Sequence, residues 1–411
     1  MDPLKFDATL DFALSTVNSW LVQHATHTSP FKGDTPAEIF FRRKCFNELC
    51  DYVVWQDSLG QLRANGSGAL LDAALGQFRP DYSELASRSP RYSLMFSAST
   101  ALAIKCRIFP SEVNAKLVAL LSGKFSWNSE LVPHRMLDLL VACHYAGAPM
   151  PVDPSKVIEV SALTLSPDAI LTDRDGLYAF THSAMYARVL KGRQLSEYAP
   201  ALDDLEGAIY RTLADNDIDL ALELTVSYLI IKGQLSAGGQ SALARVIEEL
   251  TRDGVVDGTH RPLSSVVKHF LEVKPDEKWA ATFHLMTVVG LVLSYMKAHA
   301  IGPGEILGSA AQDELHAIGH ALLHASHYRL LSAVRTLEKQ ECWSARCAPQ
   351  AEKIVRFLRF NLNQQGGFGF FQPERNYFER SGRTGDFERD VLGDLNQECH
   401  AFLAKADRWA A

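Results

Sequence analysis

The stretch that decides the predicted fold is Lys353-Ile354-Val355-Arg356-Phe357-Leu358-Arg359-Phe360-Asn361-Leu362-Asn363-Gln364-Gln365-Gly366-Gly367-Phe368-Gly369-Phe370-Phe371. Its first half places apolar side chains at helical spacing, which predicts an amphipathic helix with one buried side. Its second half contains Gln-Gln-Gly-Gly-Phe-Gly. Paired glycines can adopt positive φ and close a sharp turn, and the aromatic side chains can hold that turn against a neighbour. The stretch therefore predicts a helix that ends in a tight, packed turn.

This helix-and-glycine pattern resembles the QW-type repeat of α/α-toroid proteins, such as squalene–hopene-type cyclases and protein prenyltransferase β subunits. In those repeats, a Gln followed by Gly-Gly-aromatic-Gly joins concentric helices. The resemblance covers this stretch, where the motif is clear once. It implies a ring of helical hairpins, and it concerns architecture rather than a reaction.

Three segments in the middle of the chain are helical in pattern and end at a glycine, namely Gly147, Gly192 and Gly233. These stops lie 45 and 41 residues apart, and the last two share the pattern Tyr…Lys-Gly-x-Gln-Leu. Second helices are expected between the stops, near 202–213 and 239–252. A period near forty with two helices per period is typical of a helical-hairpin repeat, although glycine at a helix end is also ordinary C-capping.

The rest of the chain is helical in pattern too, with helices expected at 8–24, 36–58, 66–76, 93–108, 111–122, 262–272, 277–298, 309–338, 350–362 and 386–406. Almost no segment alternates apolar and polar residues as a strand would. The predicted fold class is therefore all-α, either an α/α toroid or a curved helical-hairpin repeat array. Because no Pro- or Ser-rich linker divides the chain, residues 1–125 are expected to form an N-terminal helical part that continues into the repeat part at 126–411 as one domain.

Composition and charge exclude several classes of protein. Apolar residues make up 47% and charged residues 22% of the 411, the balance of a globular protein with a large core. The net charge is −7, and no block of Lys and Arg offers the footprint of a nucleic-acid partner. The seven cysteines are scattered and form no Cys-x-x-Cys pair, which indicates a reducing, cytoplasmic setting. The sequence shows no signal-peptide core, no unbroken membrane span and no nucleotide-binding motif.

The repeat arithmetic singles out two residues that could carry chemistry. Nine residues before the Lys of each Lys-Gly stop stand His182 and Glu223. If the repeats are structurally equivalent, both side chains point toward the central cavity of a toroid, where they would form an acid–base pair. Tyr186 lies one turn beyond His182 on the same helix face. The alternative is that His182 is a core histidine bonded to a carbonyl group and that Glu223 is a satisfied helix acid.

Three further residues are candidates for the same cavity. His134 and Asp138 are four residues apart near the start of a helix, so they share one of its faces. The alternative for this region is N-terminal capping by Asn128 or Ser129. His284 stands among apolar residues, where it is either a satisfied core residue or a catalytic acid or base beside an apolar substrate.

Two patterns raise the question of a metal ion. His316 and His320 lie four residues apart on one helix face with His324, and a His-x-x-x-His pair can bind zinc, nickel or iron when another ligand completes the set. This predicts one transition-metal site, and no other cofactor is expected; the alternative is a polar helix face that happens to carry histidines. The acidic run at 215–219 is similar to the proton-donor motif of class II terpene cyclases, but Ile218 interrupts it, so the expected role is N-capping of the next helix.

These observations lead to two functional hypotheses. The first is an enzyme of secondary metabolism, of the cyclase or lyase type, that uses acid–base residues in a central helical cavity on a small, partly apolar substrate. The second is a non-enzymatic helical-repeat module that binds a peptide or protein on its concave face. Convergent polar side chains in a closed centre favour the enzyme, whereas an open groove with exposed aromatic side chains favours the interaction module.

Overall fold

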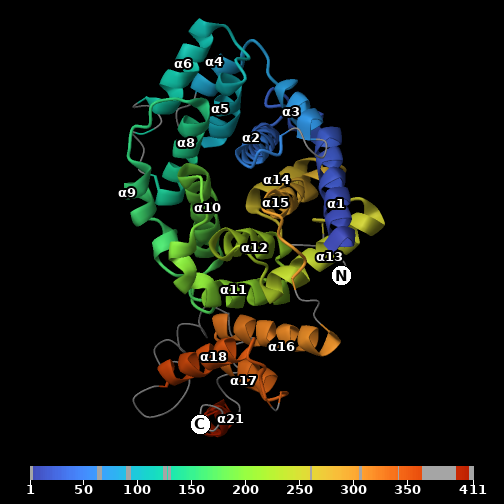
Figure 1. Ribbon diagram of the computed structural model, residues 1–411, viewed down its shortest axis with the longest axis vertical. Coiled ribbons are helices and arrows are strands. Elements are labelled where there is room, and N and C mark those ends of the chain that lie inside the picture. Colours follow the sequence, from blue (N-terminus) through green and yellow to red (C-terminus); the bar gives the residue numbers. More distant parts are fainter. Residues whose placement is uncertain are drawn as a thin grey trace. The chain divides into compact units, whose positions relative to one another are not determined.

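The protein consists of helices joined by short loops in the part of the chain that the computed structural model describes. This part comprises residues 3–62, 67–88, 94–123, 127, 131–259, 262–304, 308–340, 342–362 and 395–406. Figure 1 shows the helices in chain order. No β-strand forms within these residues, so the predicted all-α class is confirmed.

The chain folds into two compact units. Unit 1 comprises Met1–Pro167, Arg174–Leu202 and Leu222–Ile306, and unit 2 comprises Asp168–Asp173, Asp203–Ala221 and Leu307–Ala411. Helix α12 (Ile218–Lys232) belongs to both units, because the boundary at residue 221 lies inside it. The expected N-terminal helical part at residues 1–125, continuous with a repeat part at 126–411 as one domain, stays a prediction.

Among the described residues of unit 1, six helices form a closed cycle of contacts, and we call them the inner helices: α2 (Pro36–Ser58), α5 (Ser97–Lys105), α8 (Pro133–Ala146), α10 (Arg174–Lys191), α12 and α15 (Trp279–Ala298). Helix α2 packs against α5, α5 against α8, and α8 against α10. Thr181 and Glu223 connect α10 to α12, and Glu223 and His284 connect α12 to α15. Helix α15 completes the cycle by packing against α2 (Figure 1).

Other helices of unit 1 alternate with the inner helices along the chain: α1 (Pro3–His24), α3 (Ser67–Leu75), α4 (Tyr82–Ser87), α6 (Ser111–Ser122), α9 (Pro154–Glu159), α13 (Ala237–Asp253) and α14 (Ser265–Val273). Helix α6 packs against α5 and α8, α9 packs against α8 and α10, and α1 packs against α15 and α13. Short 3₁₀ helices join some of them: η1 (Ala25–Thr28), η3 (Leu94–Phe96), η4 (Ala162–Thr164) and η5 (Ser196–Ala201). This alternation is the arrangement of a helical-hairpin array, and closure into a toroid remains an interpretation of the contact cycle.

The predicted glycine stops do end three inner helices. Gly147, Gly192 and Gly233 all adopt positive φ, of 66°, 63° and 76°, which residues with a Cβ rarely tolerate. The shared Lys-Gly-x-Gln-Leu pattern also has a structural role in its first copy. There the Gln194 side chain donates a hydrogen bond to the Ile231 carbonyl at 2.9 Å, and the Leu195 amide donates to the Ile230 carbonyl at 3.0 Å. The end of one hairpin thus binds the end of the next.

Unit 2 contains α11 (Leu202–Ala214) from its second residue onward, together with α16 (Ser309–Ser326), α17 (Leu330–Leu337), α18 (Ala348–Phe360) and α21 (Leu395–Ala406). The prediction of one helix over 309–338 is wrong. Helix α16 ends because Tyr328 adopts a φ of 56°, and the Arg329 amide turns back to donate a hydrogen bond to the His324 carbonyl at 2.8 Å. Helix α17 begins at the next residue.

The amphipathic helix predicted from the opening stretch is α18. It buries Ile354, Phe357 and Leu358, while Phe360 at its end is exposed. The glycine turn at 366–369 lies outside the described residues, as do Asn128 and Ser129, so the turn and the proposed caps stay predictions. Helix α8 instead begins at Pro133, with Val132 as its N-cap residue and without a side-chain cap.

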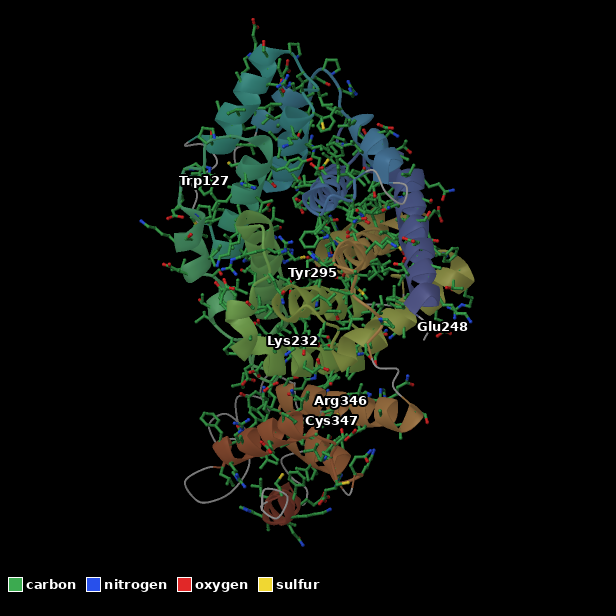
Figure 2. All side chains as sticks on the ribbon, viewed as in Figure 1. Trp127, Lys232, Glu248, Tyr295, Arg346 and Cys347 are labelled. Carbon is green, nitrogen blue, oxygen red and sulfur yellow. The ribbon has the colours of Figure 1, made fainter. Side chains whose placement is uncertain are left out.

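Helix α15 is the most apolar inner helix and is long and apolar enough, by length and composition alone, to cross a membrane. In the structure, 83% of its apolar window is buried, and Figure 2 shows this helix, marked by Tyr295, among the side chains that surround it. Gly290 lets it approach α2, because a Cβ at Gly290 would lie 2.4 Å from the hydroxyl oxygen of Tyr52. Tyr52 cannot easily move away, since its hydroxyl donates a hydrogen bond to Asn18 at 2.9 Å and accepts one from Gln56 at 2.6 Å.

Gly290→Ala should therefore destabilise the protein by about 2 kcal/mol, because overpacking forces the Tyr52 ring and its hydrogen bonds to shift. Urea unfolding followed by circular dichroism measures this change. Gly302→Ala is the matched control, since a Cβ there meets nothing within 4 Å. Equal effects of the two substitutions would contradict the close approach of α2 and α15.

Candidate functional site

The candidate site is built around Glu223, an acid in the middle of the apolar helix α12. Its side chain is only 2% exposed. The Thr181 hydroxyl of α10 donates a hydrogen bond to Glu223 Oε2 at 2.7 Å. Burying a carboxylate costs free energy unless hydrogen bonds and opposite charges surround it, so the partners of Glu223 decide what this position does.

Two histidines from neighbouring helices contact the two oxygens of Glu223. His182 Nδ1 on α10 lies 3.8 Å from Oε2, and His284 Nε2 on α15 lies 3.6 Å from Oε1. The other nitrogen of His284, Nδ1, lies 3.1 Å from Glu48 Oε1 on α2. Glu48 also pairs with Lys44, one turn earlier on α2. Bases and acids therefore alternate across four inner helices, and we call this the acid–base chain: Lys44, Glu48, His284, Glu223 and His182.

The electrostatics of the acid–base chain keep its two carboxyl groups ionised. Burial alone would raise the pKa of Glu223, but His182, His284 and the Thr181 hydroxyl together hold it below the ordinary value. Burial would likewise raise the pKa of Glu48, and the nearby charges of Lys44 and His284 hold it well below that value. Glu223 and Glu48 are therefore anions at neutral pH, and each can stabilise a positive charge on the imidazole between them.

His182 has a defined tautomer. Its Nδ1 lies 2.8 Å from the carbonyl oxygen of Tyr178, and a carbonyl oxygen only accepts, so Nδ1 carries the hydrogen. This leaves Nε2 of His182 as the atom that can take up or release a proton. The side chain is 22% exposed, and the rings of His134 and Tyr186 lie 6.0 and 5.8 Å away between centroids.

A second group of acids lies on α2 and α8, and their pKa values are raised rather than lowered. Asp138 accepts a hydrogen bond from the Ser97 hydroxyl at 2.9 Å, and Asp51 accepts one from the Asn47 amide at 3.2 Å. Burial raises the pKa of both, and the Asp138 charge also raises that of Asp51. Environments that push carboxyl pKa values apart are the usual basis for separating an acid from a base.

The structure brings five of the predicted site residues into one region of unit 1. His182 contacts Glu223, Glu223 contacts His284, and the rings of His134 and Tyr186 flank His182. Asp138 lies nearby on α8, where it is held by Ser97 and is 3.9 Å from Arg135. Glu223 and His284 are also residue types that bind divalent cations.

Sequence reasoning missed the contribution of α2. Lys44, Glu48 and Asp51 recur at i, i+4 and i+7, so they form one polar face on a helix whose neighbouring residues are buried. Such a polar face on an otherwise buried helix predicts contacts with polar residues of neighbouring helices, because buried charged residues need partners. The acidic run at 215–219 has the expected capping role, since Asp217 accepts a hydrogen bond from the Leu220 amide at 3.3 Å.

The two histidines proposed for a metal lie elsewhere. His316 and His320 belong to α16 of unit 2, and their Nε2 atoms are 3.0 Å apart. They are no part of the acid–base chain.

His134 predicts a pH dependence of stability. Burial, followed by the charges of Arg135 and His182, lowers the pKa of His134 to about 4. In the unfolded chain His134 takes up a proton near pH 6.5, whereas in the folded chain it does so only near pH 4. The stability that neutral His134 contributes is therefore fully present above pH 6.5 and is lost as the pH falls toward 4. Between pH 7 and pH 4.5 the unfolding free energy of the wild type should fall by about 1 to 2 kcal/mol more than that of His134→Gln. The figure is kept small because His134 is partly exposed to solvent. Urea unfolding at both pH values measures it, and equal losses would contradict it.

The family comparison places this region inside a shared domain. A family model described as "Domain of unknown function (DUF6895)" matches residues 14–294, which include every residue of the acid–base chain and end inside α15. No curated protein and no solved structure matches the chain. The match spans well over half of the sequence, and the chain therefore belongs to the DUF6895 family.

Proposed function

We propose that this protein is an enzyme that transfers protons to and from a small, partly apolar substrate, in a cyclase or lyase reaction of secondary metabolism. The observation that carries the proposal is the buried Glu223 carboxylate with an imidazole near each of its oxygens, supplied by two other helices. A carboxylate behind an imidazole raises the basicity of that imidazole and stabilises its cation. Such an arrangement suits repeated uptake and release of a proton.

The residues take distinct roles in this proposal. His182 Nε2 removes a proton from the substrate, since its Nδ1 is held by the Tyr178 carbonyl group, and Glu223 stabilises the imidazolium that results. His284 holds Glu223 in place from α15. The acid that protonates the leaving group or the closing ring comes from Asp51 or Asp138, whose raised pKa values favour the protonated form. Tyr186 flanks the base as a further hydroxyl group.

The buried ionic side chains of unit 1 favour an enzyme over a purely structural centre. A buried ionic network is weak evidence of stabilisation, because well-packed apolar residues of similar volume are often as stable. The contact cycle of the inner helices gathers these ionic side chains from several helices, as the interior of an α/α toroid would. The alternative interaction module would present its binding groups on an open surface, whereas Glu223, Asp138 and Thr181 are buried. A cytoplasmic location, also proposed, suits seven cysteines that form no disulfide.

The experiment that tests the function follows proton transfer without a known substrate. Purified protein is incubated in D₂O with small-molecule extracts of cells, and mass spectrometry records compounds that are consumed, formed or deuterated. Wild-type protein should convert or label a compound that Glu223→Gln leaves unchanged. If wild type and variant give the same spectra over a broad set of extracts, the enzyme proposal is wrong and the interaction module is favoured.

A further inference from the structure

One face of α16 carries imidazoles that the proposed function does not use. His316, His320 and His324 follow one another at intervals of four residues, and Asp313 precedes His316 by three, so all four share a side of the helix. The opposite side is buried through Leu315, Ile318 and Leu322. This histidine face belongs to unit 2 and lies beyond residue 294, where the family match ends.

His316 and His320 are arranged as a chelating pair. Their Nε2 atoms point at each other across 3.0 Å, and their ring centroids are 4.3 Å apart. Two histidine nitrogens bound to one tetrahedral zinc ion, each at about 2.0–2.1 Å, lie roughly 3.3 Å apart. The two atoms, which share a hydrogen bond here, are therefore within a few tenths of an ångström of the spacing of a zinc-bound pair, and the rings would turn so that both nitrogens face the ion.

The backbone beneath this pair is held in place. A Cβ at Gly319 would lie 2.5 Å from the Tyr210 carbonyl oxygen, so α16 packs directly on the backbone of α11. Glu314, two residues before His316, accepts hydrogen bonds from the amide and hydroxyl of Ser344 at 2.6 and 2.7 Å. Because the helix cannot easily turn or slide, little conformational freedom is lost when the pair binds an ion.

We propose that His316 Nε2 and His320 Nε2 chelate one divalent transition-metal ion, and that Zn²⁺ is its occupant. Imidazole nitrogens suit zinc, copper and nickel, and two histidines four apart on a helix are a known geometry for zinc. His316 is exposed and His320 partly so, which leaves the remaining coordination positions to water or an external ligand. Asp313 lies one turn before His316 on the same side of α16. The site is independent of the acid–base chain.

The test is calorimetric titration of ZnCl₂ into the untagged, chelator-treated full chain. Wild type should bind one ion at this site, and His316→Asn and His320→Asn should each weaken its affinity by about tenfold or more. His269→Asn is the matched control: His269 is an exposed helical histidine whose ring contacts Glu272 rather than another histidine, so its loss should change nothing. Circular dichroism checks that each variant is folded.

A second readout locates the ion. In protein labelled with ¹⁵N at histidine, Zn²⁺ should shift the Nε2 resonances that disappear in His316→Asn and His320→Asn. The proposal is overturned if wild type binds no Zn²⁺, or if the double variant binds it with wild-type affinity, which would place the ion elsewhere.

Discussion

Glu223→Gln is expected to lower the turnover number by about 10³-fold, within the range that one general acid–base group contributes. The amide keeps the shape of the carboxylate and can still accept the hydrogen bond from Thr181. It removes the negative charge that would stabilise an imidazolium on His182 or His284. The melting temperature should move by no more than a few degrees, because replacing a buried charge by a neutral group also removes a desolvation cost. Turnover is measured on the compound identified by deuterium labelling.

His182→Ala should give the same loss of turnover, with a similarly small change in melting temperature, because His182 faces one carboxylate only, at 3.8 Å, and its loss leaves Glu223 with His284 and Thr181. Ser227→Ala is the control on α12, since its buried hydroxyl donates only to the Glu223 backbone carbonyl group. If His182 and Glu223 are core residues instead, both substitutions should destabilise the protein while turnover per folded molecule stays normal. That pair of outcomes would remove the acid–base role.

Much of the fold could be predicted because local signals coincide with the helices. The glycines at 147, 192 and 233 end helices in the left-handed conformation that only glycine adopts at little cost. A glycine after a helical pattern therefore predicts where the helix ends. The break after α16 could not be predicted from the sequence, because it depends on a positive φ at Tyr328, and tyrosine has no preference for that conformation. Nothing local marks the two units, because their boundaries fall inside or beside helices rather than in linkers.

Part of the candidate site could be predicted, for a reason particular to repeats. Equivalent positions in successive hairpins share a radial direction, so counting back from two Lys-Gly stops found His182 and Glu223, which are neighbours in the structure. The contact between Glu48 and His284 could not be found this way. It joins α2 to α15, which are far apart in sequence and share no repeat motif, and only the closed cycle of inner helices brings them together.

The contact of His284 with two carboxylates leads to the second large effect. His284→Ala should destabilise the protein by about 2 kcal/mol at pH 7, because Glu48 and Glu223 both lose the imidazole that lies 3.1 and 3.6 Å from them. This figure is below the usual range for a broken buried ion pair, since the His284 side chain is 31% exposed. Glu48 also keeps Lys44, and Glu223 keeps His182 and Thr181.

The sign of the pH dependence makes this prediction specific. In the wild type the pKa values of Glu48 and Glu223 are lowered, so the stability they contribute is present above the ordinary carboxyl pKa of about 4.5 and is lost as the pH falls below it. The variant lacks part of that contribution. The difference in unfolding free energy between wild type and His284→Ala should therefore be fully present above pH 5 and should shrink as the pH falls through the lowered pKa values of the two carboxyl groups.

Urea unfolding of wild type, His284→Ala, Glu48→Gln and the double variant between pH 2 and pH 8 measures both effects. The double-mutant cycle should give a coupling of about 1 kcal/mol between Glu48 and His284 at pH 7 and less at pH 2, where the lowered pKa of Glu48 no longer keeps it fully ionised. His269→Ala serves as the control, because His269 and its partner Glu272 are both well exposed and such pairs contribute little. A destabilisation that is independent of pH would mean that His284 acts as a packing residue, and the alternating charges from α2 to α10 would then not operate as one network.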